Sequence, residues 1–189
     1  MKIAALLLLL IMSGCTVVQP RYIKPNERGS LNKNNIEVNK SYDVVWQSLI
    51  EYSSRSYFST KNVEKDAGLL TLSFGSSRPG KYVDCGKINS KNMKHKESFL
   101  NAAKTSGTVE LMGTMSLSMK SIDAAKTSVS VNSSYILDVK EGDFPKQTWS
   151  FDTNGKQSKK FGELVITCRS TLVAEIDIIS RINLISQGH

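Results

Sequence analysis

Apolar and polar residues alternate along much of the chain between residues 58 and 168, which is the two-residue period of strands with one buried face. A short example is LLTLSFGS, in which Leu70, Leu72 and Phe74 alternate with threonine and serine. YFSTKNVEK precedes it across a turn at 66–68, so the two segments predict a β-hairpin.

Two longer alternating stretches, at 109–119 and 129–139, flank a turn at 121–126. They predict a pair of long antiparallel strands, each with one buried face. Further strands are predicted at 36–38, around 82–83, at 149–151 and, in the segment ELVITC, at 163–168.

Other stretches repeat apolar residues at helical spacing. One follows Ser41, a favourable N-cap, and its apolar stripe consists of Tyr42, Val45, Trp46, Leu49 and Ile50. Another spans 170–186 and is apolar over a broad arc that includes Leu172, Ile176, Ile179 and Ile182. That breadth predicts extensive burial of a C-terminal helix. A short helix is also expected around 96–104, inside a basic segment at 86–106.

The predicted order is strand, helix, about six antiparallel strands and helix, which defines an α+β fold. We expect the antiparallel sheet of about six strands to pack against the C-terminal helix and the N-terminal helix. With YDVVW at 42–46 and the hairpin at Gly68, this order resembles the helix-grip arrangement of lipid-carrier domains. It is also similar to a lipoprotein of the outer-membrane β-barrel assembly machinery. The resemblance implies a single domain over 36–189 and carries over no functional residue.

The first fifteen residues, MKIAALLLLLIMSGC, have the features of a secretory signal, because Lys2 precedes an apolar run that ends in small residues. The run is shorter than the roughly 20 apolar residues of a membrane span. MSGC at 12–15 resembles the lipobox of bacterial lipoproteins, with methionine in place of the usual leucine. This resemblance implies that residues 1–14 are removed and that Cys15 is lipidated. An ordinary secretory signal cleaved nearby is the alternative.

Lipoproteins of this type carry three acyl chains on that cysteine, so a membrane is the expected partner of the N-terminus. Thr16 rather than an aspartate follows Cys15, which by the same resemblance implies an outer-membrane location facing the periplasm. The next residues are rich in proline and asparagine and have no sustained periodicity. Residues 15–35 are therefore expected to form a lipidated flexible tether.

The formal net charge is +8, and after loss of Lys2 its excess lies in the predicted tether and in the segment 86–106. In that segment, the side chains that could contact anionic lipid head groups or another envelope polyanion are Lys87, Lys91, Lys94 and Lys96. The simpler alternative is that these lysines keep an exposed loop soluble. Nucleic acid is not an expected partner, because an exported protein would not normally meet it.

Candidate catalytic groups are few. His189 is the last residue, and the local acidic groupings are Asp84 beside a cysteine and Glu175 with Asp177 on the predicted C-terminal helix. These acids are interpreted as solvated residues or as partners of the helix dipole. The glycines in GSSRPG at 75–80 belong to a turn rather than to a phosphate-binding loop. No enzymatic activity, cofactor or metal is predicted.

Cys85, in KYVDCGK, has several interpretations. A nucleophile pair with His95 lacks an orienting group, and the spacing of Cys85, His95 and Cys168 is not that of a zinc site. If lipidation consumes Cys15, however, Cys85 and Cys168 remain as an even pair in an oxidising periplasm. We therefore predict a Cys85–Cys168 disulfide that stabilises the fold by up to about 4 kcal/mol. Two buried free thiols are the alternative.

These features predict a non-catalytic, lipid-anchored envelope protein that binds another envelope protein, for example in envelope assembly or secretion. The alternative is a carrier or sensor that holds an apolar ligand between the sheet and the C-terminal helix. Met112, Met115 and Met119 could line such a cavity, because methionine adapts to varied ligands. An enzyme acting on cell wall or lipid is supported only by the expected location.

Overall fold

The computed structural model describes residues 21–27, 31, 34–89 and 96–187. The strands in these ranges are β1 (Arg21–Ile23), β2 (Asn35–Val38), β3 (Ser59–Glu64), β4 (Leu69–Gly75), β5 (Val83–Asp84), β6 (Lys87–Asn89), β7 (Glu97–Ser98), β8 (Gly107–Asp123), β9 (Lys126–Glu141), β10 (Gln147–Asp152), β11 (Lys156–Phe161) and β12 (Leu164–Ser170). The helices are α1 (Tyr42–Arg55), α2 (Phe99–Ser106), α3 (Val173–Gln187) and the short 3-10 helix η1 (Pro79–Lys81). The predicted residues that fall outside the described ranges are Cys15, Lys91, Lys94, His95 and His189.

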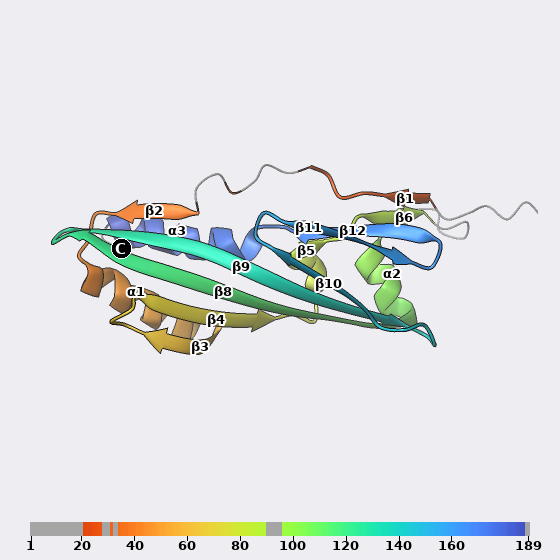
Figure 1. The fold of residues 1–189 in the computed structure, drawn as a ribbon, viewed down its shortest axis with the longest axis horizontal. Helices are drawn as coiled ribbons and strands as arrows, with labels where there is room; N and C mark the ends of the chain where they lie inside the picture. The colour runs from red at the N-terminus through yellow and green to blue at the C-terminus, as the bar shows by residue number, and fades with distance from the viewer. Residues whose placement is uncertain (1–20, 28–30, 32–33, 90–95, 188–189) are drawn as a thin grey trace, which may run out of the picture.

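A long hairpin of β8 and β9 forms the centre of the fold (Figure 1). Its strands contain 17 and 16 residues and pair along almost their whole length. β4 and then β3 continue the sheet beside β8, while β10 and β2 pair with successive parts of the other edge of β9. The result is an antiparallel sheet of six strands, and the predicted α+β fold class is confirmed.

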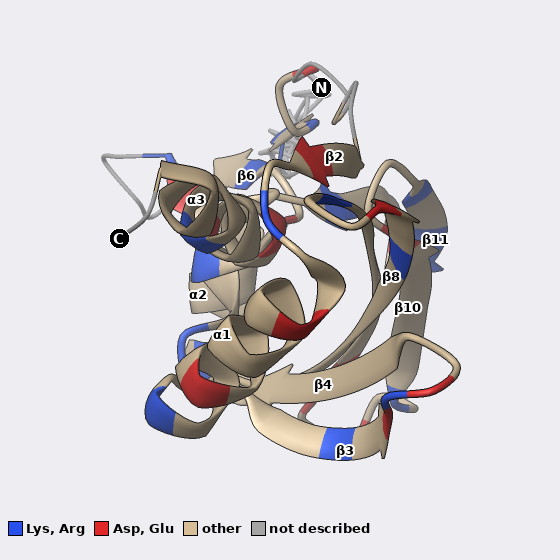
Figure 2. Ribbon diagram, turned by 90° about the vertical axis from the view of Figure 1, so that its left-hand side faces the viewer, with Lys and Arg blue, Asp and Glu red and all other residues tan. Residues whose placement is uncertain are grey.

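The main sheet has one buried and one solvent-facing side. Every second residue of β8 and β9 is buried through most of the hairpin, as the alternating pattern predicts. Helices α1 and α3 cover the buried side, and Figure 2 shows both helices on the same side of the curved sheet. Fully buried leucines such as Leu49 and Leu117 each contribute roughly 1.5–3 kcal/mol through the hydrophobic effect.

Helix α3 buries only part of the predicted broad apolar arc, which also included Ile178 and Ile185. Its buried face consists of Ala174, Glu175, Ile178, Ile182 and Ile185. Ile176, which was assigned to the arc, is 50% exposed. The many isoleucines leave the rotation of this helix undetermined by periodicity, and packing of Ile178 and Ile182 against the sheet decides it.

A second region lies at one end of the β8–β9 hairpin (Figure 1). There β11, β12 and β5 form a three-stranded sheet, and β1, β6 and β7 form another. Helix α2, close to the short helix predicted at 96–104, lies between these strands and the hairpin. This end of the molecule is called the β1 end below and comprises the start of β1, helix α2, the β9–β10 loop and the β11–β12 turn.

Part of the segment predicted as a flexible tether is folded. Arg21–Ile23 form β1, which pairs with β6, and Asn35 begins β2. Tyr22 lies opposite Ile88 in this pairing. In the described part of 15–35 the structure therefore differs from a flexible tether, because Arg21–Ile23, Glu27 and Asn35 contact the domain. Local composition indicated a linker, whereas the partner strand lies far along the chain.

Candidate functional site

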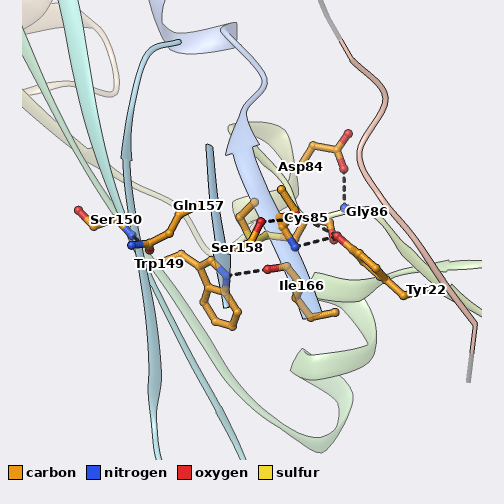
Figure 3. The surroundings of a disulfide bond; sticks show 11 residues. Tyr22, Asp84, Cys85, Gly86, Trp149, Ser150, Gln157, Ser158 and Ile166 are labelled. Carbon is orange, nitrogen blue, oxygen red and sulfur yellow. Dashed lines mark hydrogen bonds between the residues drawn. A yellow bond between two sulfur atoms is a disulfide. The ribbon is translucent and has the colours of Figure 1, made fainter. Parts of the chain in front are cut away.

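Cys85 and Cys168 form a disulfide bond (Figure 3). Cys168 lies within β12, and Cys85 directly follows β5, which pairs with β12 through Asp84 and Arg169. Both cysteines are buried in the core. The sulfur atom considered above as a nucleophile or zinc ligand is thus part of a covalent link, away from solvent.

Tyr22 holds the N-terminal segment against the strands that carry the disulfide (Figure 3). Its hydroxyl accepts a hydrogen bond from the backbone N–H of Thr167 at 2.9 Å. It can donate to the carbonyl oxygen of Cys85 at 3.1 Å or of Thr167 at 3.0 Å. Burial raises the pKa of this phenol. A Cβ at Gly86, where φ is +77°, would lie 2.2 Å from the carbonyl oxygen of Ile23, so only glycine permits this approach.

Glu27 extends the contact between the N-terminal segment and the domain. Its carboxylate pairs with Lys156 at 3.1 Å and with Arg169 at 3.5 Å. The hydrogen bond and the charge of Lys156 lower the pKa of Glu27. Such exposed ion pairs contribute little to the free energy of folding. Their role is to orient the N-terminal segment on the domain.

Glu175 is buried in the first turn of α3, so the interpretation of it as a solvated residue is wrong, whereas its position fits a partner of the helix dipole. The hydroxyl of Tyr135, on the inner face of β9, lies 2.8 Å from each carboxyl oxygen of Glu175. Burial, and then the neighbouring carboxyl group, raise the pKa of Tyr135. A buried carboxyl group needs a hydrogen-bond donor, and Tyr135 supplies it. Because neither side chain is accessible to solvent, this pair is structural.

The other candidate catalytic residues are not brought together with Glu175. Asp177 lies near Tyr52 of α1; burial and then a hydrogen bond with Asp177 raise the pKa of Tyr52 to about 12. Asp84 accepts a hydrogen bond from the N–H of Gly86 at 2.9 Å and so holds the turn after β5. In the part of the chain that the structure describes, no group of three or more histidine, cysteine, aspartate and glutamate residues could hold a metal ion.

The methionines proposed to line a cavity lie on different sides of the sheet. Met115 and Met119 are buried in the core, whereas Met112 lies on the outer face and is 56% exposed. Between the sheet and α3, the side chains of Ile178 and Ile182 are fully buried.

An apolar pocket of about 480 Å³ lies beside α2, at the β1 end of the molecule. It is formed by α2, the β9–β10 loop, β6 and the turn between β11 and β12. Apolar side chains in its lining include Ile88, Phe99, Ala102, Phe144, Phe161 and Leu164. These residues come from segments far apart in the sequence, and for that reason the linear pattern did not reveal the pocket.

The outer face of the main sheet carries a block of short, uncharged polar side chains. Thr71, Ser116 and Asn132 lie side by side across β4, β8 and β9, and the next row is Ser73, Thr114 and Ser134. The block, called the hydroxyl face below, consists of Thr71, Ser73, Thr114, Ser116, Ser118, Ser128, Ser130, Asn132, Ser134 and Ser150. None of the helices in the described residues covers this side (Figure 2).

Comparison of the chain with protein-family models, with curated proteins and with solved structures finds no match. Among the described residues, no helix has both the length and the apolar character needed to cross a membrane. Function is therefore inferred from this chain's own residues.

Proposed function

We propose that this protein is a non-catalytic, lipid-anchored envelope protein that binds another envelope protein through the hydroxyl face. In this proposal, lipidated Cys15 holds the domain at the periplasmic side of the outer membrane. The observation that carries the binding role is the uncovered, charge-poor centre of the main sheet. Charged residues lie toward the ends of β8 and β9, for example at Glu110, Lys120 and Lys140.

The composition of the hydroxyl face lowers the free-energy cost of covering it. Serine and threonine lose less rotamer freedom on burial than lysine, glutamate or arginine do. The absence of charge from the block also avoids the large desolvation penalty of a buried ion. Hydroxyl groups can act both as donors and as acceptors, so they adapt to a partner's polar groups. The matching partner is a protein surface that is flat, poor in charge and rich in hydrogen-bonding groups.

The anchor is tested by changing Cys15 to serine in the full chain. We expect the unaltered protein to incorporate labelled palmitate and to fractionate with outer membranes, and Cys15→Ser to lose both properties. Palmitate incorporation that survives the substitution would contradict the assignment of Cys15. The matched control is Cys85→Ala/Cys168→Ala, which removes the other cysteines and leaves Cys15 in place.

The interface is tested by photo-crosslinking in cells. A photoreactive residue at Thr114, in the centre of the hydroxyl face, should yield a crosslink to one defined envelope protein. The same residue at Ser54, which is exposed on α1, is the matched control and should yield no such product. Ser116→Glu should abolish the crosslink from Thr114, because it buries a charge in the interface. Crosslinks of equal yield from both positions, or a crosslink that Ser116→Glu leaves unchanged, would refute this interface.

The pocket beside α2 favours a second candidate function, the binding of an apolar ligand. Its volume of about 480 Å³ is within the range of small-molecule sites, roughly 300–1,000 Å³. This pocket is separate from the space between the sheet and the C-terminal helix in which a ligand was expected. The two candidate functions use different surfaces and are compatible with each other.

A further inference from the structure

The apolar pocket and the first described residue of the chain lie at the same end of the molecule (Figure 1). β1 begins there at Arg21, and its strand partner β6 contributes Ile88 to the pocket. Helix α2, the β9–β10 loop and the β11–β12 turn, which form the rest of the pocket, reach the same end. The pocket is therefore on the part of the domain closest along the chain to the proposed lipid anchor.

The link between the anchor and the domain is short. Six peptide units separate Cys15 from Arg21, and an extended chain advances about 3.5 Å per residue, so the link spans at most about 20 Å. Because β1 is paired with β6 and Tyr22 is hydrogen-bonded to β12, this limit applies to the rigid domain. The β1 end thus remains within about 20 Å of the lipidated cysteine, whatever path the link takes.

Apolar and basic side chains near the pocket can contact a membrane surface, and the acidic residues of its lining are Glu141 and Glu163. Phe144, in the β9–β10 loop at the edge of the pocket, is 62% exposed. An exposed phenylalanine ring can enter the boundary between head groups and acyl chains, as apolar residues of membrane-surface helices do. Lys87 and Lys96 are exposed at the same end, on either side of the segment outside the described residues, and can contact anionic head groups.

We propose that the pocket beside α2 binds one hydrocarbon chain of a membrane phospholipid, with the β1 end of the domain facing the bilayer. This inference rests on the proposed lipid anchor, because the anchor places the pocket next to its ligand. Phe99, Phe161 and Leu164 contact the chain, while Phe144 lies at the opening. Sequestering a chain in an apolar pocket removes its surface from water, and the domain is thereby held in one orientation on the membrane.

The fluorescence of the two tryptophans can report whether a labelled acyl chain enters the pocket. Trp149 lies next to the pocket, with its ring centroid 6.1 Å from that of Phe99 and 6.2 Å from that of Phe161. Trp46 lies on α1, toward the opposite end of the hairpin (Figure 1). The mature full chain is reconstituted into vesicles of phosphatidylethanolamine and phosphatidylglycerol in which some phospholipid carries a nitroxide near the end of one acyl chain. Trp46→Phe reports Trp149 alone, and Trp149→Phe reports Trp46 alone.

We expect the nitroxide to quench Trp149 several-fold more strongly than Trp46. Ala102→Leu fills the pocket and should reduce the quenching of Trp149 to the level of Trp46. Thr105→Leu, at an exposed position of the same helix, is the matched control and should leave the quenching unchanged. If Ala102→Leu impairs folding, Phe144→Ala provides a second variant, because it removes pocket lining at an exposed loop residue.

Equal quenching of the two tryptophans would overturn the proposal. It would also be overturned by quenching of Trp149 that Ala102→Leu and Phe144→Ala leave unchanged, because the end would then lie near the membrane with an empty pocket. Occupation by the protein's own acyl chains or by a peptide would likewise leave any quenching of Trp149 unchanged by both substitutions. If the chain does not bind vesicles, the anchor proposal fails separately. Nitroxide-labelled stearic acid added to the soluble protein then tests the pocket with the same variants and the same criteria.

Discussion

Cys85 and Cys168 link two segments that lie 83 positions apart in the sequence, and both cysteines are buried. A cross-link of this span restricts the unfolded chain and contributes about 4 kcal/mol on the chain-entropy model. We therefore expect Cys85→Ala/Cys168→Ala to lower the free energy of unfolding by about that amount. Urea denaturation followed by circular dichroism measures the change.

Thiol titration of the unfolded, unreduced mature protein is the direct check of the cross-link. We expect no titratable thiol, because Cys15 carries lipid in the proposed mature form. The same sample after reduction serves as the control and should show the thiols of Cys85 and Cys168. Two free thiols per chain before reduction would show that the bond is absent.

Tyr135 and Glu175 form a buried polar pair in an otherwise apolar core. We expect Tyr135→Phe to destabilise the protein by roughly 1–3 kcal/mol, because it leaves a buried carboxyl group without its donor. Glu175→Gln should cost less, since the amide oxygen can still accept a hydrogen bond from the phenol. Both effects are measured as shifts in the midpoint of urea denaturation, provided that the dependence of the unfolding free energy on urea concentration stays constant.

The control for this pair is Tyr42→Phe. The Tyr42 hydroxyl also donates a hydrogen bond, to the carbonyl oxygen of Lys65, but at an exposed position where water can replace it. Its loss should change stability by less than about 1 kcal/mol. If Tyr135→Phe were as harmless as Tyr42→Phe, the pair would contribute nothing measurable to the free energy of unfolding.

At the scale of elements, β1 was not predicted from the sequence, and its docking on the domain can be tested directly. Tyr22 makes hydrogen bonds to the backbone of Cys85 and Thr167 that replace contact with water. We expect Tyr22→Phe to weaken docking of β1 by at least about 1.4 kcal/mol, which corresponds to a tenfold larger fraction of the open form. Trypsin cleavage after Arg21, followed by mass spectrometry, measures this opening.

In Tyr22→Phe, the free energy of global unfolding should change much less than the free energy of β1 docking, because the core of the main sheet is not involved. Cleavage after Lys61 in β3 is the internal control and should be unaffected. Cleavage after Arg21 as slow as in the unaltered protein would mean that β1 is held by its pairing with β6 rather than by Tyr22.

Elements were predictable where one residue pattern persists over several turns or strand periods. β8 and β9 alternate over 17 and 16 residues, and α1 has a single apolar stripe, so local sequence determines which side is buried. β11, with the sequence KQSKKF, has no such apolar alternation and was missed. β1, β5, β6 and β7 have only two or three residues each, and their pairing depends on distant partners.

Whether a candidate site could be predicted also depended on how far apart its residues lie in the sequence. The Cys85–Cys168 pair was predictable because cysteine chemistry restricts its partners to very few residues. Glu175 was not, because its burial depends on Tyr135, which lies 40 positions away. The pocket beside α2 combines Ile88, Phe144 and Leu164 from separate segments, and no periodicity links them.

At the scale of the whole molecule, phenols with a raised pKa lie in several parts of the fold. Burial is the main cause that raises the pKa of Tyr22, Tyr42, Tyr52, Tyr57 and Tyr135 above the ordinary value of 10.0. These side chains lie at the β1 end, on or after α1, and under the centre of the sheet. Their ionisation therefore reports on all parts of the domain at once.

We expect the protein to lose stability steeply in alkali. A phenol whose folded pKa is raised favours the neutral form in the folded state, so its contribution is complete below pH 10.0. Above that pH the unfolded chain loses protons that the folded chain retains, and the free energy of unfolding falls as pH rises through the folded pKa, which is about 12 for Tyr52. Urea denaturation at a series of pH values, together with phenolate absorbance, measures this window. Tyr135→Phe should show a shallower decline, because one such phenol is removed. Phenolate absorbance that develops fully near pH 10.0 in the folded protein would show instead that these hydroxyl groups are open to water.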